Sequence, residues 1–579
     1  MVNPVMQLAS ATRDGTRAAT TGVTLEVGAY ACLAALALVL RLAAGSAPLS
    51  PQEAEQALAA HHLLRGDTDA VSVSGAVAPT LLALQSLLFF LFGVSDWTAR
   101  LPVVLLTALT PATLWLWRAT LGRRRALLAA ALLTLSPGLS AVGGLGVGAG
   151  LAGVALLLAG GCLLHHRRQG GQRWAMAAGF SLGLALGCAA EAWAAVAIAA
   201  GIGLALRFPL PSRRTGSALA AGLGLSLLVA TVAFIHPAGL QQWLEQAADL
   251  AQSLFRREPG ALLTQVLLLS GYEPLLLLAG LAAFATRPAT RHGLAVRLWT
   301  AVALLLVLLA GSPGFGLVLA LPGLALLAAR TLGTAWERFV GLSSRQRAEV
   351  LSVGFILVGY AVMALSGIAR RGDAVFLLLL LTAVGIAVAL LALLWMRDGR
   401  PAALAGAASV MLLLLTFWSV ASCLQGAGLR RSLPHELTRP AVAEPGALDL
   451  AEDVAALSRS RSGFATDLAL VVERDAGATV AWYLRDMREL TWVSRLAGEL
   501  TAPALVGAGA DLELSLGEYV GQDYAVSSAW SPQFGGAGEL LRWLLYREIP
   551  VKTVDTHWVS LWVLAPADLA APVGAIELP

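Results

Sequence analysis

The chain contains little cysteine, and the cysteines it has are far apart. All four of them, Cys32, Cys162, Cys188 and Cys423, lie in or beside apolar segments, with no close pairing in the sequence. This spacing argues against a disulfide framework and against a zinc site. It indicates small buried thiols instead.

Charge is also scarce. Charged residues make up 13% of the 579 residues, and Lys552 is the only lysine. The net charge of +4 is carried by arginines that are scattered between apolar segments, so the basic face that nucleic-acid binding needs is missing. No glycine-rich phosphate loop follows a predicted strand, which argues against a nucleotide-binding Rossmann domain.

What the chain does have is a long series of apolar segments. Apolar residues make up 57% of the sequence and the mean hydropathy is +0.73. Over the first 422 residues the apolar segments are mostly about 17 to 23 residues long, which matches a hydrocarbon core of about 30 Å. The sequence therefore predicts a polytopic α-helical membrane protein. Thirteen spans are expected, at 25–44, 99–119, 126–143, 145–163, 174–190, 192–207, 217–235, 263–286, 296–310, 314–331, 350–368, 374–396 and 402–422.

The arginines between the spans predict the orientation. In a thirteen-span register most of them fall on the side of the N-terminus, which the positive-inside rule assigns to the cytoplasm. Residues 1–24 are then a cytoplasmic segment of a multi-pass plasma (inner) membrane protein, and the first span is too long for the core of a signal peptide. The apolar stretch 78–94 must be re-entrant or interfacial in this register. If it crosses the membrane, the count becomes fourteen and both termini lie on one side.

The spans and loops suggest a division into domains. A transmembrane domain at 25–429 carries two long outer loops, 45–98 and 236–262, and residues 430–579 have the composition of a soluble domain. Within 430–579, helical and strand patterns alternate, which predicts an extracytoplasmic α/β domain. The expected helices are 448–459, 476–487 and 538–546, and the expected strands are 468–473, 504–506 and 558–563.

Both outer loops contain an amphipathic segment. In the first loop, Ser50 can cap and Pro51 can begin a helix that runs to Leu64 along the membrane interface. His61 and His62 lie on different sides of this helix, so no metal pair is predicted there. The second loop has a similar amphipathic pattern.

Five short segments resemble the GT-C superfamily of integral-membrane glycosyltransferases. The branch they resemble includes protein O-mannosyltransferases, lipid A aminoarabinose transferases and flippase-associated relatives. The segments are Pro48–Ala54, Phe92–Pro102, Leu135–Pro137, Tyr272–Pro274 and Trp482–Asp486.

The resemblance implies a transferase that moves a sugar from a polyprenyl-phosphate donor to an extracytoplasmic lipid, glycan or protein acceptor. A carboxylate at the membrane surface would take the acceptor proton, and an arginine or a divalent cation would neutralise the departing phosphate. No metal site is predicted, and the implied partners are the lipid-linked sugar, membrane lipid and other membrane proteins. The candidate catalytic residues are Glu53 and Glu55, and the candidate substrate-binding residues are Glu191, Arg256, Arg257, Tyr272 and Glu273.

Several departures from the family pattern leave an alternative open. Family members usually have an Asp-Glu pair in the first loop, where this chain has Gln52 and Glu53, and Glu55 points to another helix face than Glu53. Segment 141–150 lacks the Arg and Asp that relatives carry, and 75–79 lacks their His-Gly-Pro. A non-catalytic GT-C-like protein that binds lipid-linked sugar or scaffolds a membrane complex is therefore the alternative. A secondary transporter is a third hypothesis, for which paired halves and charges within the spans are missing.

Overall fold

A computed structural model describes twelve stretches of the chain. They are residues 25–44, 47–67, 77–209, 211–255, 260–288, 290–312, 314–425, 436–439, 441–496, 502–508, 519–548 and 553–564. The expected cytoplasmic segment 1–24 and the candidate residues Arg256 and Arg257 lie outside this part of the chain.

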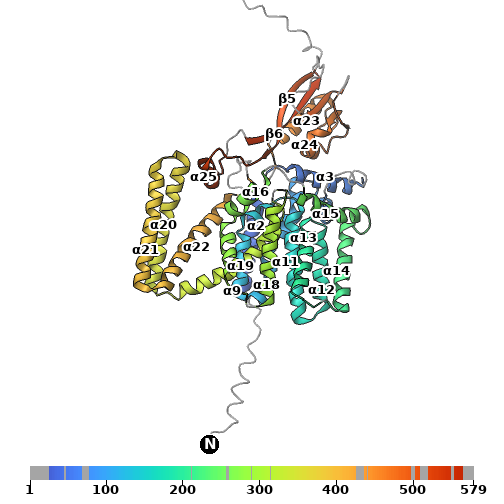
Figure 1. Cartoon of the computed structure of the whole chain (residues 1–579). Coiled ribbons are helices and arrows are strands. Elements are labelled where there is room, and N and C mark those ends of the chain that lie inside the picture. The colour runs from blue at the N-terminus through green and yellow to red at the C-terminus, as the bar shows by residue number, and fades with distance from the viewer. Residues whose placement is uncertain are drawn as a thin grey trace, which may run out of the picture.

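The described chain consists of a helical body and a C-terminal α/β domain (Figure 1). The first helices of the body are α2 (Leu25–Ala44), α3 (Pro51–Arg65), α5 (Pro79–Phe92), α6 (Asp96–Ala108), α7 (Thr110–Thr113), η1 (Leu114–Trp117), α8 (Arg118–Leu121), α9 (Arg123–Thr134), α10 (Pro137–Gly144) and α11 (Gly148–Gln169). The next are α12 (Gln172–Leu186), α13 (Glu191–Ala205), α14 (Arg213–Ala230), α15 (Ala238–Phe255), α16 (Ala261–Leu267), the π-helical turn η2 (Leu268–Tyr272), α17 (Pro274–Ala282) and η3 (Ala283–Ala285). The last are α18 (Arg291–Leu309), α19 (Leu317–Val340), α20 (Ser344–Arg371), α21 (Ala374–Asp398) and α22 (Arg400–Leu424).

The protein is a multi-pass membrane protein. Among the described residues, eight stretches are long and apolar enough to cross a bilayer, and two helix pairs bent by 60° and 87° raise the number to ten if each pair counts as one span. The eight are Leu25–Ala43, Asp96–Leu121, Gly148–Gln169, Arg291–Leu309, Leu317–Val340, Ser344–Arg371, Ala374–Asp398 and Arg400–Leu424, and the bent pairs are α9 with α10 and the helices on either side of Glu273.

The other three predicted spans, 174–190, 192–207 and 217–235, correspond to helices that fall short of this criterion. Helices α12 and α13 have 15 residues each, and the 18-residue α14 begins with Arg213 and Arg214. The count of thirteen therefore stays a prediction. Helix α5 has 14 residues and is about 21 Å long, too short to cross the hydrocarbon core, which agrees with the interfacial or re-entrant interpretation of 78–94.

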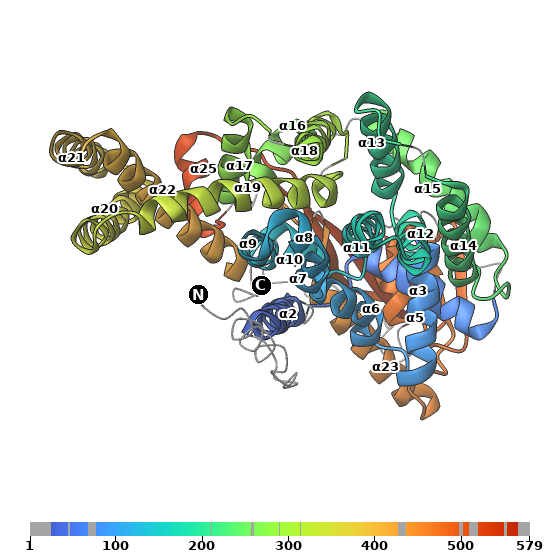
Figure 2. The ribbon, with the colours of Figure 1, turned by 90° about the horizontal axis from the view of Figure 1, so that it is seen from below.

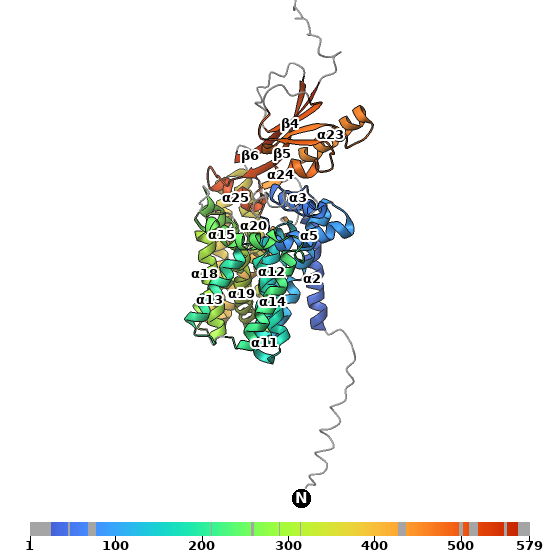
Figure 3. The same cartoon turned by 90° about the vertical axis from the view of Figure 1, so that its right-hand side faces the viewer.

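The helices of the body run side by side, and the C-terminal domain lies at one end of them (Figures 1 and 3). Helices α3 and α15 lie at this same end, which we call the domain side. Helix α19 is the most buried candidate span and packs against α9, α17 and α18. Helices α20 and α21 extend away from the rest of the body (Figure 2), and few of their residues are buried by protein.

The C-terminal domain is built on one six-stranded sheet. The strands are β1 (Ala441–Ala443), β2 (Leu470–Glu473), β3 (Leu490–Val493), β4 (Ala504–Ala508), β5 (Tyr519–Trp530) and β6 (Val554–Leu564), in the order β1-β5-β6-β4-β2-β3. Strands β3, β2 and β4 are parallel, and the other pairs are antiparallel. The helices are α23 (Gly446–Ser462), η5 (Arg474–Ala476), α24 (Gly477–Tyr483) and α25 (Ala537–Tyr546).

The predicted α/β character of this domain is confirmed, but its details are only partly right. The three predicted helices and three predicted strands are present, and β1, β3 and β5 were missed. The predicted helix 476–487 was too long, because α24 ends at Tyr483, where the chain turns toward β3. In the assembled molecule α24 packs on α3 and α25 packs on α20, where Arg542 Nε donates to the carbonyl oxygen of Ala369 at 2.6 Å.

Candidate active site around a glycine-rich helix

Helix α10 and the residues after it form the centre of the candidate site. Ser136 begins the helix: its hydroxyl accepts the backbone N–H of Leu139 at 3.3 Å, and Pro137 occupies the first turn. Segment 141–150 has no ionisable side chain of its own, and five of its ten residues are glycine. Because glycine has no side chain, ionisable groups from other elements approach its backbone closely.

The first of these groups is Glu53, which forms a buried ion pair with Arg100. Both side chains are at most 4% exposed, Arg100 Nε lies 2.6 Å from Glu53 Oε1, and Nη2 lies 2.8 Å from Oε2. The backbone N–H of Gly146 also donates to Oε1 at 2.7 Å, and the N–H and hydroxyl of Ser50 donate to Oε2 at 3.0 and 2.9 Å. Five hydrogen bonds therefore hold Glu53 between α3, α6 and the glycine-rich segment.

This environment makes Glu53 a weak base. Burial alone would raise the pKa of the carboxyl, but the charge of Arg100 and the hydrogen bonds outweigh burial and lower the pKa. The charge of Arg439, from the start of the C-terminal domain, also acts on Glu53. A carboxylate with both oxygens engaged and a lowered pKa is suited to hold structure and poorly suited to accept a proton.

Glu55 and Gln52 lie elsewhere on α3. Gln52 is exposed and Glu55 is half-buried, while Glu53 between them points inward. As expected, Glu53 and Glu55 lie on different faces of α3. The two carboxylates do not form a pair.

A second ionisable group at the glycine-rich helix is Arg41. It is 1% exposed, and its only hydrogen bond within the described chain runs from Nη1 to the carbonyl oxygen of Ala37, at 3.1 Å. Its Nε lies against Gly143, where a β-carbon would be only 2.5 Å away. No carboxylate of the described residues lies within 4.0 Å of Arg41, so its charge is buried without a counterion there.

The third group is Glu273, which joins the Leu135–Pro137 and Tyr272–Pro274 segments. The hydroxyl of Ser136 and the backbone N–H of Gly138 both donate to Glu273 Oε1, the latter at 2.9 Å. Glu273 is 2% exposed and lies at the 87° bend between η2 and α17. Within the described chain no donor bonds its Oε2.

Tyr272, next to Glu273, connects the same bend to the C-terminal domain. Its hydroxyl donates to Glu436, and the guanidinium of Arg547 lies 4.1 Å from the centre of its ring. Arg547 also stacks on Trp543 at 4.6 Å and lies 3.9 Å from Glu436. The expected substrate-binding residue Tyr272 therefore has a clear structural role as well.

Asp96 makes the second connection between the body and the domain. Its two carboxylate oxygens accept the indole N–H of Trp482 at 2.7 Å and the hydroxyl of Tyr483 at 2.6 Å. The same tyrosine hydroxyl accepts the N–H of Leu49 at 3.0 Å, and burial with the Asp96 contact raises the pKa of Tyr483. The Phe92–Pro102 and Trp482–Asp486 segments are thus in direct contact.

A cavity of about 360 Å³ lies beside this contact, between α2, α6 and the start of α23. Arg41, Asp96 and Arg100 supply its charged lining. Its other lining residues are Leu42, Ala47, Pro48, Trp97, Val104 and Leu448.

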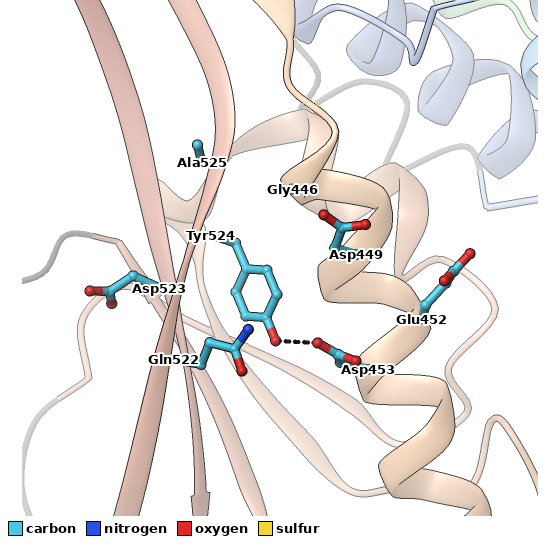
Figure 4. A pocket seen from close by; sticks show the side chains of 8 residues that line it. All are labelled: Gly446, Asp449, Glu452, Asp453, Gln522, Asp523, Tyr524 and Ala525. Atoms are coloured by element: carbon cyan, nitrogen blue, oxygen red, sulfur yellow. Dashed lines mark hydrogen bonds between the residues drawn. The ribbon is translucent and has the colours of Figure 1, made fainter.

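A larger cavity, about 540 Å³, lies within the C-terminal domain between α23 and β5 (Figure 4). Asp449, Glu452 and Asp453 line it from α23, and the hydroxyl of Tyr524 donates to Asp453 at 2.6 Å. In the part of the chain that the structure describes, no group of three or more His, Cys, Asp or Glu side chains is arranged to hold a metal ion.

Glu191 lies apart from the α10 cluster. It is 9% exposed at the first turn of α13, and the backbone of Gly316 donates a hydrogen bond to it. The neighbouring Ala190 packs on Ala310 and Phe315, near the connection between α18 and α19. Of the predicted carboxylates, the structure thus brings Glu273 to the start of α10 and Glu53 to the glycines that follow it, and leaves Glu55 and Glu191 elsewhere.

Sequence reasoning missed Arg41, Asp96 and the arginine contacts of the C-terminal domain. Placing an arginine within an apolar span is energetically unfavourable, so the position of Arg41 in the sequence could have marked it as a candidate site residue. The partner of Arg100 could not be found in the same way, because 47 residues separate it from Glu53.

The contact between α3 and α24 gives a prediction on pH dependence. His61 is 6% exposed, and neither ring nitrogen has a hydrogen-bond partner in the described chain. Burial is the main cause that lowers its pKa to about 4. The neighbouring charges that act on it are those of Arg65, Arg485, Asp486 and His62.

Because the folded pKa is lower than the unfolded value of about 6.5, the unfolded state binds the proton first as the pH falls. We expect the free energy of unfolding to drop by on the order of 2 kcal/mol between pH 6.5 and 4. Thermal unfolding in detergent across this range should show a flatter profile for His61→Gln and an unchanged profile for the more exposed His62→Gln. Equal slopes for wild type and His61→Gln would contradict this assignment.

The chain is similar to one protein family and to several solved structures. The family model of dolichyl-phosphate-mannose-protein mannosyltransferases matches residues 76–236. The crystal structure of ArnT from Cupriavidus metallidurans bound to undecaprenyl phosphate is similar with a TM-score of 0.51 and 18% identity, covering 86% of this chain and 95% of that chain. The apo structure of the same protein gives a TM-score of 0.50 and 17% identity, covering 84% and 94%. No curated protein sequence matches the chain.

These similarities show the fold of the chain. The chain has the fold of the GT-C integral-membrane glycosyltransferases, and the resemblance inferred from its five segments is confirmed. Within that class, the region from 76 to 236 is similar to the dolichyl-phosphate-mannose-protein mannosyltransferases.

Proposed function

We propose that this protein is a membrane glycosyltransferase that moves a sugar from a polyprenyl-phosphate donor to an extracytoplasmic acceptor. One observation carries the proposal: the five segments of the GT-C resemblance, which are far apart in the sequence, form two sets of direct contacts at the two ends of one short segment. Glu53 of the first set accepts the N–H of Gly146, and Glu273 of the second accepts the N–H of Gly138. Arg100 bonds Glu53, Ser136 bonds Glu273, and Asp96 bonds the Trp482–Asp486 segment. A fold alone does not require these contacts.

The proposed reaction is an inverting displacement. The acceptor oxygen forms a bond to the anomeric carbon of the sugar while the bond from that carbon to the lipid phosphate oxygen breaks. The acceptor proton passes to a carboxylate, and the polyprenyl phosphate departs with the bonding electron pair. The protein must supply a base with an accessible oxygen and a cation near the leaving phosphate.

Glu273 is the base that the contacts favour. Its hydrogen bonds from Ser136 and Gly138 orient one carboxylate oxygen and leave the other without a donor in the described chain. Glu273 also lies beside the segment in which relatives carry an acidic residue and this chain has none. Glu55, half-buried on α3, is the second candidate base.

The remaining site residues take supporting roles in the proposal. Glu53 positions α3 and α6 through its pair with Arg100, and Tyr272 holds the C-terminal domain next to Glu273. Arg256 and Arg257 are proposed to contact the lipid phosphate, and Glu191 is proposed to contact substrate. The domain side is proposed to face outward from the plasma membrane, with the N-terminus in the cytoplasm.

The test is a transfer assay with the full chain in nanodiscs. Polyprenyl phosphates that carry radiolabelled hexoses or pentoses are offered with lipid, glycan and peptide acceptors, and the release of free polyprenyl phosphate is measured. At least one donor should give release that depends on the acceptor. If lipid-linked sugars bind but none is turned over, the transferase proposal is wrong.

That last outcome would support the second candidate function, a non-catalytic protein that binds lipid-linked sugar or scaffolds a membrane complex. The observation that favours it is the engagement of Glu53 by five hydrogen bonds together with the exposed Gln52, where relatives have an acidic pair.

A further inference from the structure

The cavity between α2, α6 and α23 contains a buried arginine, Arg41, for which the described residues supply no carboxylate within 4.0 Å. Arg41 lines it, is 1% exposed and makes one hydrogen bond in the described chain, to a backbone carbonyl of its own helix. A buried charge without a counterion is strongly unfavourable in a membrane protein. The arrangement therefore calls for an anion in the cavity.

The other charged groups of the cavity already have partners, and the neutral donors to Asp96 leave its negative charge in place. Arg100 is paired with Glu53, and Asp96 accepts hydrogen bonds from Trp482 and Tyr483. Asp96 is the one carboxylate that the described residues place in the lining, and both of its oxygens already accept hydrogen bonds, so the cavity is poorly supplied with a base. It is suited to binding and not to the displacement reaction itself.

The position of the cavity indicates where the anion comes from. Helices α2 and α6 belong to candidate spans, and Leu42, Pro48 and Val104 give the cavity an apolar wall at their domain-side ends. Only 22% of the span in α2 is buried by protein, and Val39 of α2 and Leu105 of α6 are exposed. A lipid with its phosphate in the cavity could lay its acyl chains along these side chains.

We infer that this cavity binds the phosphate group of an anionic membrane phospholipid, with Arg41 as the charged contact. The volume of about 360 Å³ lies within the range of about 300 to 1,000 Å³ that is common for small-ligand sites. Leu448, from the first turns of α23, contributes to the same wall, so the bound lipid would contact both the helical body and the C-terminal domain. This inference does not depend on the transfer reaction.

Gly143 allows a second test of the role of Arg41. A β-carbon at this position would lie 2.5 Å from Arg41 Nε and 2.9 Å from the hydroxyl of Thr107, so Gly143→Ala must displace the guanidinium without removing its charge. Gly28, on the same helix as Arg41, has open space around it and serves as the control. Arg65, 58% exposed on α3, is the control arginine.

The experiment measures binding of dioctanoyl phosphatidic acid to the full chain in a neutral detergent. Dioctanoyl phosphatidylcholine, inorganic phosphate and farnesyl phosphate are measured in parallel arms. We expect saturable binding of phosphatidic acid, weakened at least about tenfold in Arg41→Met and in Gly143→Ala, because a hydrogen bond to a charged group is worth about 1.5 to 3 kcal/mol. Gly28→Ala and Arg65→Gln should bind like wild type.

A second readout separates a binding role from a structural one. Without ligand, Arg41→Met should unfold at the same temperature as wild type or higher, since it removes a buried unpaired charge. Unchanged phosphatidic acid binding in both Arg41→Met and Gly143→Ala would overturn the inference. So would Arg41-dependent binding of inorganic phosphate alone, or of farnesyl phosphate alone, because the occupant would then be a free ion or the donor carrier. Failure of the transfer assay would leave these results unaffected.

Discussion

Replacing Arg100 with methionine should destabilise the domain side by about 3 to 5 kcal/mol, the largest stability effect expected for a single substitution in this chain. The substitution leaves Glu53, which is 1% exposed, as a buried carboxylate without its counterion. It also removes the donors to the carbonyl oxygens of Ala47 and Pro48, which fix the chain that leads into α3. Thermal and denaturant unfolding in detergent would measure the loss.

A double-variant cycle isolates the ion pair from other effects of the substitution. Glu53→Leu combined with Arg100→Met removes both charges and should recover most of the stability that Arg100→Met alone loses. Arg65→Met, which removes an exposed arginine 3.9 Å from Asp486, should change stability by less than about 1 kcal/mol. An Arg100→Met protein as stable as wild type would show that the pair is not required.

The same pair governs how variants of Glu53 are interpreted. Glu53→Gln keeps the side-chain shape but loses the charge that faces Arg100. A loss of transfer in this variant would identify a catalytic role only if thermal unfolding were unchanged, and the contacts of Glu53 predict that unfolding does change. Glu55→Gln leaves the Glu53–Arg100 pair intact, and its thermal unfolding is measured in the same way.

Much of the fold could be predicted because a membrane-spanning helix requires a long apolar segment, which can be recognised in the sequence. Apolar length alone identified helices such as α2, α20, α21 and α22, which face lipid over most of their surface. Helices α12 and α14 were also expected from their apolar residues, but their close backbone contact with each other was not. A β-carbon at Gly179 would lie 2.2 Å from the carbonyl oxygen of Leu219, so glycine permits this approach.

The bends of the helices at the site and the contact partners of the site residues could not be predicted from the sequence. Pro274 marks a break between two helices, but nothing local in Tyr272–Pro274 specifies the angle of 87° or the contact with Ser136, which lies 137 residues away from Glu273. The five segments were recognised correctly as a set, but their contacts are tertiary. The sequence analysis noted only that segment 141–150 lacks ionisable residues, whereas in the structure its glycines let Glu53 and Arg41 approach. Gly138, shortly before the segment, lets Glu273 approach.

Edge strands explain the gaps in the C-terminal domain. Strands β1 and β3 have three and four residues and lie at the two edges of the sheet, so they have little of the alternating burial that marks a strand in the sequence. Strand β5 is long, but its first residues are exposed, so this part of the strand lacks the alternation of buried and exposed residues that marks a strand. The predicted strands were β2 and β4, which are mostly buried, and β6, which is long.

Glu273→Gln should lower the rate of sugar transfer by about 10² to 10⁴-fold while the protein stays folded. The amide oxygen of glutamine can still accept the Ser136 hydroxyl and the Gly138 N–H, so both contacts that hold the side chain remain available. What the substitution removes is the ability to accept a proton. The rate should be measured in nanodiscs at saturating donor, together with the thermal midpoint.

Three companion variants make this result specific. Ser136→Ala removes one of the two hydrogen bonds that orient Glu273 and should reduce the rate by a smaller factor. Tyr272→Phe breaks the contact with Glu436 next to Glu273, so it tests whether the C-terminal domain affects the rate through this bend. If Glu273→Gln transfers sugar at the wild-type rate and Glu55→Gln does not, the base is on α3. Because Glu273 is held by α10 and Glu55 by α3, the two variants place the reaction on one side of the glycine-rich segment or the other.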